Sequence, residues 1–199
     1  MALPAEVQQG LYIRAGRVAN KVPNIGQSYS QITGVERKSA WGNCNYVAVG
    51  APNTPAYRIT DGLPANFLFI SNIGNGVALG IVPRAMLTAP IYVFSDNYGG
   101  CQFHIASSAD AVAFLHVYRG GGGVANYTLG AGWTPRGVLH SNTVPAIGGP
   151  PQVINGRPVI KDVGSFAYIA AGTTTAECCF LEMTQGQIDQ VHGHTPVNF

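Results

Sequence analysis

The sequence predicts a mostly β fold of the α+β class, in which two packed sheets, mixed or antiparallel, form a β-sandwich with few peripheral helices. Runs of alternating apolar and polar residues, rich in β-branched and aromatic side chains, recur throughout the chain. Clusters of Gly, Pro and Asn separate these runs, and segments with helical periodicity are scarce. A length of 199 residues suits a single domain, which we place at residues 1–199.

The individual elements follow from these runs in chain order. Each predicted strand is an apolar run of β-forming side chains between turn-forming residues. Two short helices are predicted at Ala5–Gln9 and Gln185–Val191, and the Gly- and Pro-rich stretches Ala131–Pro135 and Pro145–Pro151 are interpreted as surface loops. Strands are expected at Leu11–Val18, Tyr46–Val49, Ala56–Ile59, Phe67–Ser71, Val77–Val82, Ile91–Ser95, Cys101–Ala106, Val112–Arg119, Val124–Leu129, Pro158–Lys161, Phe166–Ala170 and Ala176–Glu182.

The glycine run Gly120–Gly123 follows a predicted strand and could form a turn or hold a phosphate. A phosphate loop needs a Lys-Ser/Thr pair after the glycines and a helix that follows. The sequence has neither at this place, so we interpret the run as a turn.

Composition argues against several classes of function. Hydrophobic residues make up 46% of the chain, which excludes a disordered protein. The formal net charge is +2 and the Lys and Arg residues are scattered, so we expect no nucleic-acid partner. No stretch approaches the roughly 20 apolar residues of a membrane-spanning helix. The first residues lack the pattern of a Sec-type signal peptide, and we therefore expect synthesis in the cytoplasm.

The four cysteines, Cys44, Cys101, Cys178 and Cys179, are scattered and contain no CxxC pair. This spacing supports neither a disulfide scaffold nor a structural zinc site. We expect free thiols, no metal and no cofactor. The adjacent Cys178 and Cys179 should point to opposite faces of a strand.

The segment from Ile91 to Arg119 carries the strongest candidate for chemistry. The polar stretch SSAD at residues 107–110 lies between two apolar runs and predicts a hairpin. With the turn centred between residues 108 and 109, Cys101 lies directly across from His116. Directly opposed residues have Cβ atoms about 4.5–5.5 Å apart, so the thiol and the imidazole can meet. The two side chains would form a polarisable pair at the end of an otherwise apolar sheet face.

This pair has the chemistry of an activated nucleophile. An adjacent imidazolium favours the thiolate, which is the nucleophilic form of cysteine. Gly99 and Gly100 come directly before Cys101 and leave the backbone open to a substrate carbonyl, so the oxyanion donor is expected to be the N–H of Cys101 or of a neighbour. The alternative is structural, because free cysteines and strand histidines are often simply buried.

The pattern Ser95-x5-Cys101-x14-His116 resembles the active-site signature of the cysteine-dependent protein glutamine deamidases. That group includes the catalytic domain of the cytotoxic necrotizing factors, the Burkholderia lethal factor and the chemoreceptor deamidase CheD. Its nucleophilic Cys opens a strand, and its His lies on the neighbouring strand. Ser95 stands where the lethal factor and CheD have Thr, and Gly99-Gly100 stands where the toxins have Ser-Gly. The resemblance covers residues 91–119.

The resemblance implies a hydrolase that converts protein glutamine to glutamate through a thioester, with a transglutaminase side reaction when an amine replaces water. Cys101 would be the nucleophile and His116 the acid–base group. The third group would be Ser95, through its hydroxyl or carbonyl, or a carbonyl from another segment, as in the necrotizing factors.

The resemblance also implies a bacterial effector or toxin, which a specialised secretion system would deliver to the host cytosol. Its partner would be a host protein such as a GTPase or a translation factor. Two alternatives stay open: a chemoreceptor deamidase of the CheD type, and a non-catalytic Gly-rich β-sandwich with a binding or structural role.

Other polar residues have weaker signals. His104 faces away from Cys101 by strand parity and is interpreted as structural. His192 and His194 form an HxH motif, but no carboxylate or Cys cluster accompanies them in the sequence, so a polar C-terminal tail is expected rather than a metal site. Asp96 is a further candidate for orienting His116.

Overall fold

A computed structural model describes residues 12–15, 31–49, 54–60, 66–120, 123–145, 147, 152–154, 156–159, 161–184 and 187–199. Strands dominate these ranges, and none of them contains an α-helix. Two single turns of 3-10 helix are η2 (Arg84–Met86) and η3 (Ser141–Thr143). The predicted fold, mostly β with mixed and antiparallel sheets, is confirmed.

The main sheet has the strand order β1-β18-β17-β16-β7-β5-β3-β4, and β1 pairs with both β18 and β4, so the order closes on itself. Its pairs are antiparallel except for β5 with β7 and β1 with β4, which are parallel. The strands are β1 (Tyr12–Ala15), β3 (Ser39–Val49), β4 (Thr54–Thr60), β5 (Phe67–Ile70), β7 (Ile91–Ser95), β16 (Asp162–Ile169), β17 (Thr175–Thr184) and β18 (Gln187–Asn198).

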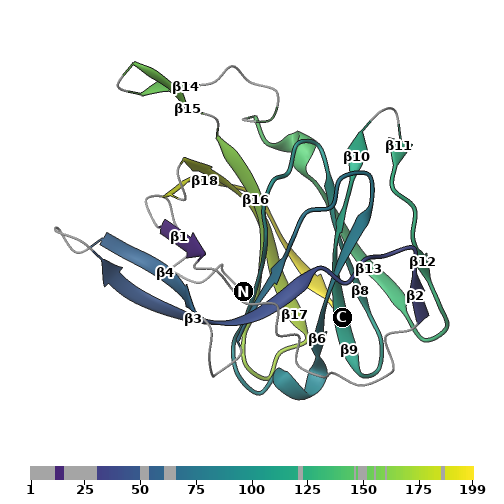
Figure 1. Ribbon diagram of the computed structural model, residues 1–199. Helices are drawn as coiled ribbons and strands as arrows, with labels where there is room; N and C mark the ends of the chain where they lie inside the picture. Colours follow the sequence, from purple (N-terminus) through teal and green to yellow (C-terminus); the bar gives the residue numbers. More distant parts are fainter. Residues whose placement is uncertain are drawn as a thin grey trace.

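The second sheet is antiparallel and has the order β13-β8-β9-β6 (Figure 1). Three short strand pairs complete the described structure: β2 with β12, β10 with β11, and β14 with β15. The bounds are β2 (Ile32–Thr33), β6 (Val77–Pro83), β8 (Gln102–Ser107), β9 (Ala111–Val117), β10 (Arg119–Gly120), β11 (Gly123–Val124), β12 (Thr128–Leu129), β13 (Thr134–His140), β14 (Gln152–Ile154) and β15 (Arg157–Val159).

The largest apolar core lies between the two sheets. Strands β5, β7, β16 and β17 of the main sheet and strands β6, β8 and β9 of the second sheet contribute buried side chains to it. Burying one large apolar side chain contributes about 1.5–3 kcal/mol, so this layer is the main source of stability. Its most deeply buried members include Leu68, Ile70, Ile91, Phe103, Ile105, Phe114 and Phe180.

Strand β9 is packed on both of its faces. All seven of its residues are buried, so both faces of the sheet are covered. Leu115 and Val117 pack in a cluster with Trp133 on the outer side, whereas Val112 and Phe114 enter the core between the sheets. The side chain of His116 lies on the same face as Val112 and Phe114, because alternate residues of a strand share a face.

The C-terminal strand corrects one prediction. The helix expected at Gln185–Val191 is wrong, because residues 187–198 form β18 and pair antiparallel with β17. Without β18, one side of β17 would have unpaired backbone groups, and this tertiary pairing outweighs the weak helical pattern of the sequence. The helix expected at Ala5–Gln9 lies outside the described residues.

Strand β13 was not predicted. Pro135 and Gly137 disfavour a regular strand, and a register shift lies between these two residues in the pairing with β8. As an edge strand of the second sheet, β13 tolerates both. The strand expected at Val124–Leu129 is instead divided between β11 and β12.

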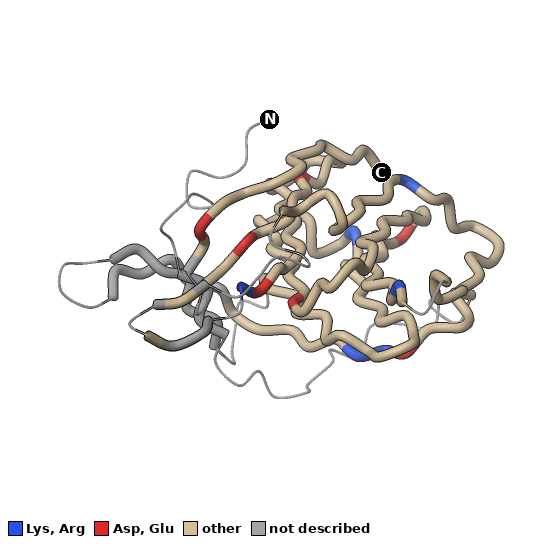
Figure 2. Tube along the Cα trace, turned by 90° about the horizontal axis from the view of Figure 1, so that it is seen from above, with Lys and Arg blue, Asp and Glu red and all other residues tan. Residues whose placement is uncertain are grey.

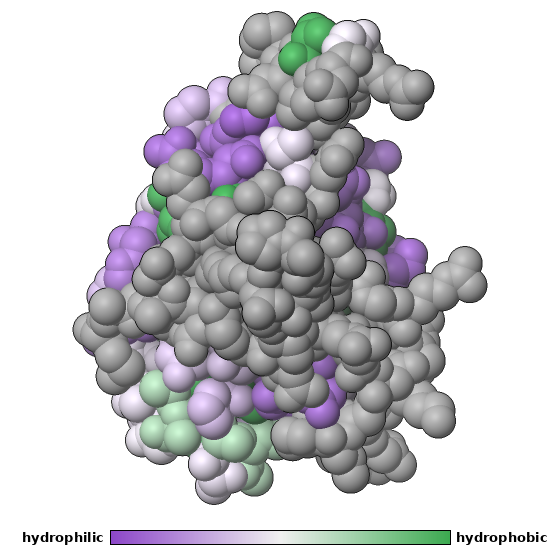
Figure 3. Space-filling view, turned by 90° about the vertical axis from the view of Figure 1, so that its left-hand side faces the viewer, coloured by the Kyte–Doolittle hydropathy of each residue, from purple (hydrophilic) through white to green (hydrophobic). Residues whose placement is uncertain are grey.

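Charge is sparse on the described surface. Figure 2 shows the charged residues scattered over the molecule. Among the coloured atoms of the face drawn in Figure 3, the strongly hydrophobic areas are small. Among the described residues, the large hydrophobic side chains that are exposed are Val124, Val138 and Val153. In the same residues, no helix has the length and apolar character needed to span a membrane.

Candidate active site

Ser95 and His116 meet across the core. Ser95 is the last residue of β7 in the main sheet, and His116 belongs to β9 in the second sheet. Ser95 Oγ and His116 Nδ1 lie 2.8 Å apart, and both side chains are buried. The structure therefore brings together two of the residues that the sequence singled out, from strands of different sheets.

The hydrogen bonds of Ser95 fix the tautomer of His116. Ser95 Oγ donates its single proton to the carbonyl oxygen of Ile70, at 2.7 Å, because a carbonyl can only accept. Toward His116, Ser95 Oγ is then an acceptor, so Nδ1 carries the imidazole proton. Nε2 of the neutral ring is therefore the nitrogen with the free lone pair.

Nε2 of His116 is buried and has no hydrogen-bond partner among the residues that the structure describes. An unpaired polar atom in a buried position is costly and rare in native proteins, so each one needs a structural or functional explanation. Burial also lowers the pKa of His116 to about 4, since the charged imidazolium loses its hydration. The resting His116 is a neutral base at pH 7.

Tyr98 covers the imidazole. Its ring stacks on the ring of His116, with centroids 4.0 Å apart, and meets the ring of Phe180 edge-on. Ser165 Oγ donates a hydrogen bond to the Tyr98 hydroxyl at 3.0 Å, and that hydroxyl also bonds to Ser95. Burial raises the pKa of Tyr98 far above its usual value, so the phenol stays protonated. Tyr98 is part of the site that sequence reasoning missed, although it lies only three residues before Cys101.

The predicted register of the hairpin is wrong by two residues. Phe103, not Cys101, lies directly across from His116, and Cys101 precedes the first residue of β8. The hydroxyl of Ser108 accepts hydrogen bonds from the N–H groups of Asp110 and Ala111, and this serine turn moves the centre of the hairpin by one residue. A two-residue shift keeps each side chain on its predicted face.

Cys101 therefore lies diagonal to His116 on the same face of the sheet. Diagonal positions on neighbouring strands are about 7–8 Å apart, and the expected contact is not formed, because Cys101 Sγ makes no hydrogen bond to His116 Nε2. Both residues are almost fully buried, with exposed fractions of 4% for Cys101 and 1% for His116. The predicted face of Cys101 is confirmed by its place in the inter-sheet core with Phe103 and Ile105.

Ser141 holds the backbone at Cys101. Its N–H and its Oγ both donate to the carbonyl oxygen of Cys101, at 3.2 Å and 2.7 Å. Ser141 begins η3, directly after β13, and is fully buried. Sequence reasoning missed Ser141, because only the pairing of β13 with β8 brings it beside Cys101.

The two predicted glycines provide an open backbone before Cys101. Within the described residues, the N–H groups of Gly99, Gly100 and Cys101 have no hydrogen-bond acceptor. Space is free where a Cβ would extend from Gly99 or Gly100. Gly100 has a φ of +112°, which other residues rarely adopt, whereas Gly99 does not have this constraint. These N–H groups are available to an incoming oxyanion.

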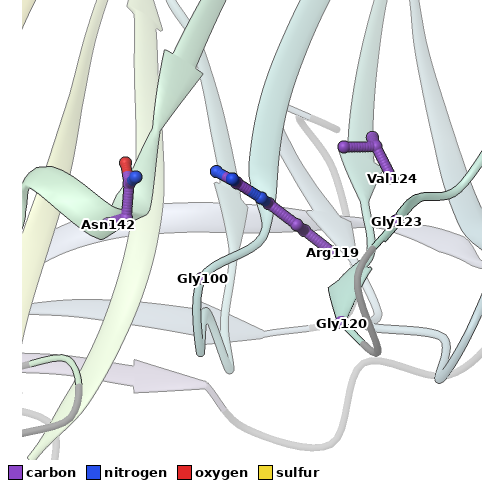
Figure 4. Close-up of a pocket in the computed structure, with 6 residues that line it drawn as sticks. All are labelled: Gly100, Arg119, Gly120, Gly123, Val124 and Asn142. Atoms are coloured by element: carbon purple, nitrogen blue, oxygen red, sulfur yellow. The ribbon is translucent and has the colours of Figure 1, made fainter.

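A cleft of about 560 Å³ opens beside Gly100. Figure 4 shows that its walls come from three parts of the chain, with Gly100 between Asn142 of η3 and Arg119 of β10. The cleft touches residues adjacent to both Cys101 and Ser141. Cys101 itself does not line the cleft, so this opening comes beside the candidate site without reaching the sulfur.

The other singled-out residues lie elsewhere. Nδ1 of His104 is 2.9 Å from the Tyr127 hydroxyl, and Nε2 is 2.7 Å from Gln102 Oε1, which fits its structural interpretation. Cys178 and Cys179 lie in different apolar clusters on opposite faces of β17, as predicted. Ser95, and not Asp96, bonds to His116 Nδ1.

The expectation of a polar C-terminal tail is wrong for the HxH motif. His192 and His194 belong to β18, and each bonds to a glutamate of β17: Nε2 of His192 lies 3.0 Å from Glu182, and Nε2 of His194 lies 2.7 Å from Glu177. Carboxylates thus accompany both histidines through strand pairing, which the sequence does not reveal. In the described part of the chain, no cluster of three or more His, Cys, Asp or Glu side chains could hold a metal ion.

Comparison of the chain with protein-family models, with curated proteins and with solved structures finds no match. The geometry of Ser95, His116 and Cys101 is therefore the basis on which a function can be proposed.

Proposed function

We propose that this protein is a protein glutamine deamidase in which Cys101 is the nucleophile and His116 the general base. The observation that carries this proposal is the state of His116. Ser95 binds Nδ1 at 2.8 Å, which leaves the lone pair of Nε2 unpaired and buried on the sheet face that also carries Cys101. A hydroxyl that orients a histidine has the role of the third group of a catalytic triad, and Cys101 Sγ, which makes no hydrogen bond to Nε2 in this structure, must move within reach of that nitrogen to complete the triad.

In the first half of the reaction, Cys101 Sγ attacks the side-chain carboxamide carbon of a glutamine. The thiol proton moves to Nε2 of His116, and the new imidazolium keeps its Nδ1–H bond to Ser95 Oγ. The tetrahedral oxyanion accepts hydrogen bonds from the N–H groups of Gly100 and Cys101. His116 then returns the proton to the departing nitrogen, ammonia leaves, and a thioester remains.

In the second half, water replaces ammonia. His116 Nε2 takes one proton from the water, whose oxygen attacks the thioester carbon. The C–S bond breaks, the sulfur leaves with the proton held by His116, and glutamate is released. Each turnover consumes one water and produces one ammonia. An amine that reaches the thioester before water would give a transglutamination product by the same steps.

The low pKa of His116 determines the resting state in this scheme. Burial lowers that pKa to about 4, so the imidazole is neutral before the substrate arrives. The proposed pair therefore rests as thiol and imidazole, and proton transfer accompanies the attack. This replaces the preformed thiolate–imidazolium pair that the sequence suggested.

The biological setting belongs to the same proposal. The segment that contains Ser95, Cys101 and His116 resembles bacterial toxins, which supports an effector that enters the cytosol of a host cell and modifies a host GTPase or translation factor. The chemoreceptor deamidases share this local pattern, so a bacterial receptor is the alternative target.

A non-catalytic binding or structural module is the second candidate. The burial of Cys101 and His116 favours it, because a substrate must reach the sulfur. The nearest opening is the cleft beside Gly100. Replacing Cys101 separates the two candidates. The replacement abolishes the activity of a catalyst, whereas a structural module has no deamidase activity with or without Cys101.

The test is a search for converted glutamines in two soluble proteomes, one from human cells and one from a chemotactic bacterium. Each is incubated with the wild-type protein, with Cys101→Ala or with Cys178→Ala, and peptides are screened by mass spectrometry for glutamine converted to glutamate. Cys178 is a matched control, because it is a buried thiol of the same core. The proposal predicts conversion by the wild type and by Cys178→Ala only. The same peptide pattern with all three proteins would overturn it.

A further inference from the structure

We propose that the cleft beside Gly100 is a carboxylate-binding subsite in which Arg119 recognises an Asp or Glu side chain of the substrate protein. This inference rests on the proposed function, since it treats the cleft as the approach to Cys101. It adds a substrate class: glutamines that have an acidic residue close to them on the target surface.

The cleft has a single charged wall. It is lined by Gly100, Arg119, Gly120, Gly123, Val124 and Asn142. Figure 4 shows the Arg119 side chain extending across the cleft toward Asn142. None of the lining residues is acidic, so the cleft has a positive charge. A ligand with a negative charge complements this surface.

The Arg119 side chain has no ion pair or hydrogen bond with any residue that the structure describes. Two other arginines in these residues do have such partners. Arg136 donates to Ser107 Oγ at 2.7 Å, and Arg84 donates to the carbonyl oxygen of Ser108 at 3.0 Å. The guanidinium of Arg119 thus has its donors available, and its planar fork matches the two oxygens of a carboxylate.

The glycines of the cleft leave room for the substrate protein to approach the backbone of the cleft. The space around Gly123 is free, and at Gly120 an added Cβ would lie 2.3 Å from the Tyr118 hydroxyl, so a side chain there would require the Tyr118 ring to move. Asn142 adds a carboxamide that can both donate and accept. Asn142 follows Ser141, which holds the carbonyl of Cys101, so the cleft and the nucleophile share one rigid support.

The test compares two alkylating reagents of similar size. Iodoacetate carries a carboxylate and iodoacetamide is neutral; in both, a sulfur–carbon bond to Cys101 forms while iodide leaves. Modification of Cys101 is measured by peptide mass spectrometry in the wild type, Arg119→Gln and Arg136→Gln. Each ratio of the rate with iodoacetate to the rate with iodoacetamide is normalised to the ratio for the urea-unfolded chain.

The proposal predicts that Arg119→Gln lowers the normalised ratio about fivefold at low ionic strength, an effect typical of a solvent-accessible ion pair. Arg136→Gln should leave the ratio unchanged. An equal ratio in the wild type and Arg119→Gln would overturn the carboxylate subsite, even with a fully reactive Cys101.

A second measurement does not depend on the reactivity of Cys101. Glutarate is titrated into the isotope-labelled protein, and the backbone amide resonances of Gly100, Gly120 and Gly123 are followed by NMR. Saturable shifts that Arg119→Gln removes support the subsite, and their absence in the wild type contradicts it. If Cys101 reacts with neither reagent but these shifts occur, the proposed catalysis is wrong and the subsite stands.

Discussion

Ser95 Oγ lies 2.8 Å from His116 Nδ1 and connects the end of β7 in one sheet to β9 in the other. This contact crosses an otherwise apolar core and fixes which nitrogen of the imidazole is basic. A purely structural histidine in such a position would be expected to use both nitrogens, because leaving one buried and unpaired costs free energy. His116 uses only Nδ1 within the described residues.

Replacing Ser95 by Ala should lower the deamidation rate about 10- to 100-fold. The variant removes the acceptor for Nδ1–H, and hydrogen bonds to charged groups contribute about 1.5–3 kcal/mol. The free energy of this hydrogen bond is lost mainly in the transition state, in which the imidazole becomes positive, so the activation barrier rises. Because the Nδ1–H bond to Ser95 favours the imidazolium, its loss lowers the pKa of His116, and the acid limb of the pH–rate profile should move to lower pH in Ser95→Ala, whereas a merely structural role would leave that limb in place.

Ser107→Ala is the matched control for Ser95→Ala. Ser107 is also a buried serine at the end of a core strand, but its hydroxyl bonds to Arg136 rather than to His116. Its removal should leave the rate and the pH profile within about twofold of the wild type, as for a change that costs under 0.5 kcal/mol in the transition state. Equal losses in both variants would show that Ser95 matters only for packing.

Gly99 and Gly100 should respond differently to alanine. Both have free space for a Cβ, but only Gly100 has a left-handed φ, of +112°. Gly100→Ala strains the backbone by about 1–3 kcal/mol or turns the N–H groups away from the oxyanion, so the rate should fall at least tenfold. Gly99→Ala should fold and react like the wild type. Steady-state rates and urea unfolding of both variants test this, and a larger loss in Gly99→Ala would contradict the assignment of the oxyanion donors.

Stability should decrease as the pH falls from about 6.5 to 4. The folded-state pKa of His116 is about 4, below the ordinary value of 6.5, so the unfolded chain binds a proton first as the pH falls. His116 therefore contributes stability that is fully present above pH 6.5 and is lost on acidification, up to about 3 kcal/mol. His104, whose pKa burial also lowers to about 4, acts in the same direction.

Urea unfolding of the wild type and His116→Gln at pH 7 and pH 4.5 measures this effect. The loss of stability on acidification should be smaller in His116→Gln, because glutamine does not titrate. If both proteins lose the same free energy, His116 is not buried in its neutral form.

Gly164 should tolerate no side chain. An added Cβ would lie 2.6 Å from the ring of Phe94 and 3.0 Å from the carbonyl oxygen of Ser95. We expect Gly164→Ala to destabilise the fold by about 1–3 kcal/mol, as overpacking does, and to lower activity by displacing Ser95. At Gly74 a Cβ meets nothing within 4 Å, so Gly74→Ala is the control. Thermal unfolding that ranks the two variants equally would contradict this packing.

Much of the site could be predicted from the sequence because strand alternation is a local property. The alternation assigned Cys101, Phe103 and His116 to one face, and the structure confirms that face. The exact register was not predictable, because it depends on the hydrogen bonds of Ser108 within the turn. A turn displaced by one residue moves the pairing by two.

Long-range pairing explains the remaining misses. Ser141 contacts Cys101 only because β13 pairs with β8, and β13 contains a proline and a glycine that conceal it in the sequence. In the same way, the glutamate partners of His192 and His194 come from β17 and become visible only when β18 pairs with it.

The most direct test of the central claim is the rate at which iodoacetamide modifies each thiol at pH 7. We expect Cys101 to be alkylated first and His116→Gln to slow its modification at least tenfold, since the base that takes the thiol proton is gone. Cys178 and Cys179 should stay unmodified in the folded protein, because burial raises the pKa of both thiols, that of Cys179 to about 12. The assignment of Cys101 and His116 as nucleophile and base is wrong if Cys44, Cys178 or Cys179 reacts before Cys101, or if His116→Gln leaves the Cys101 rate unchanged.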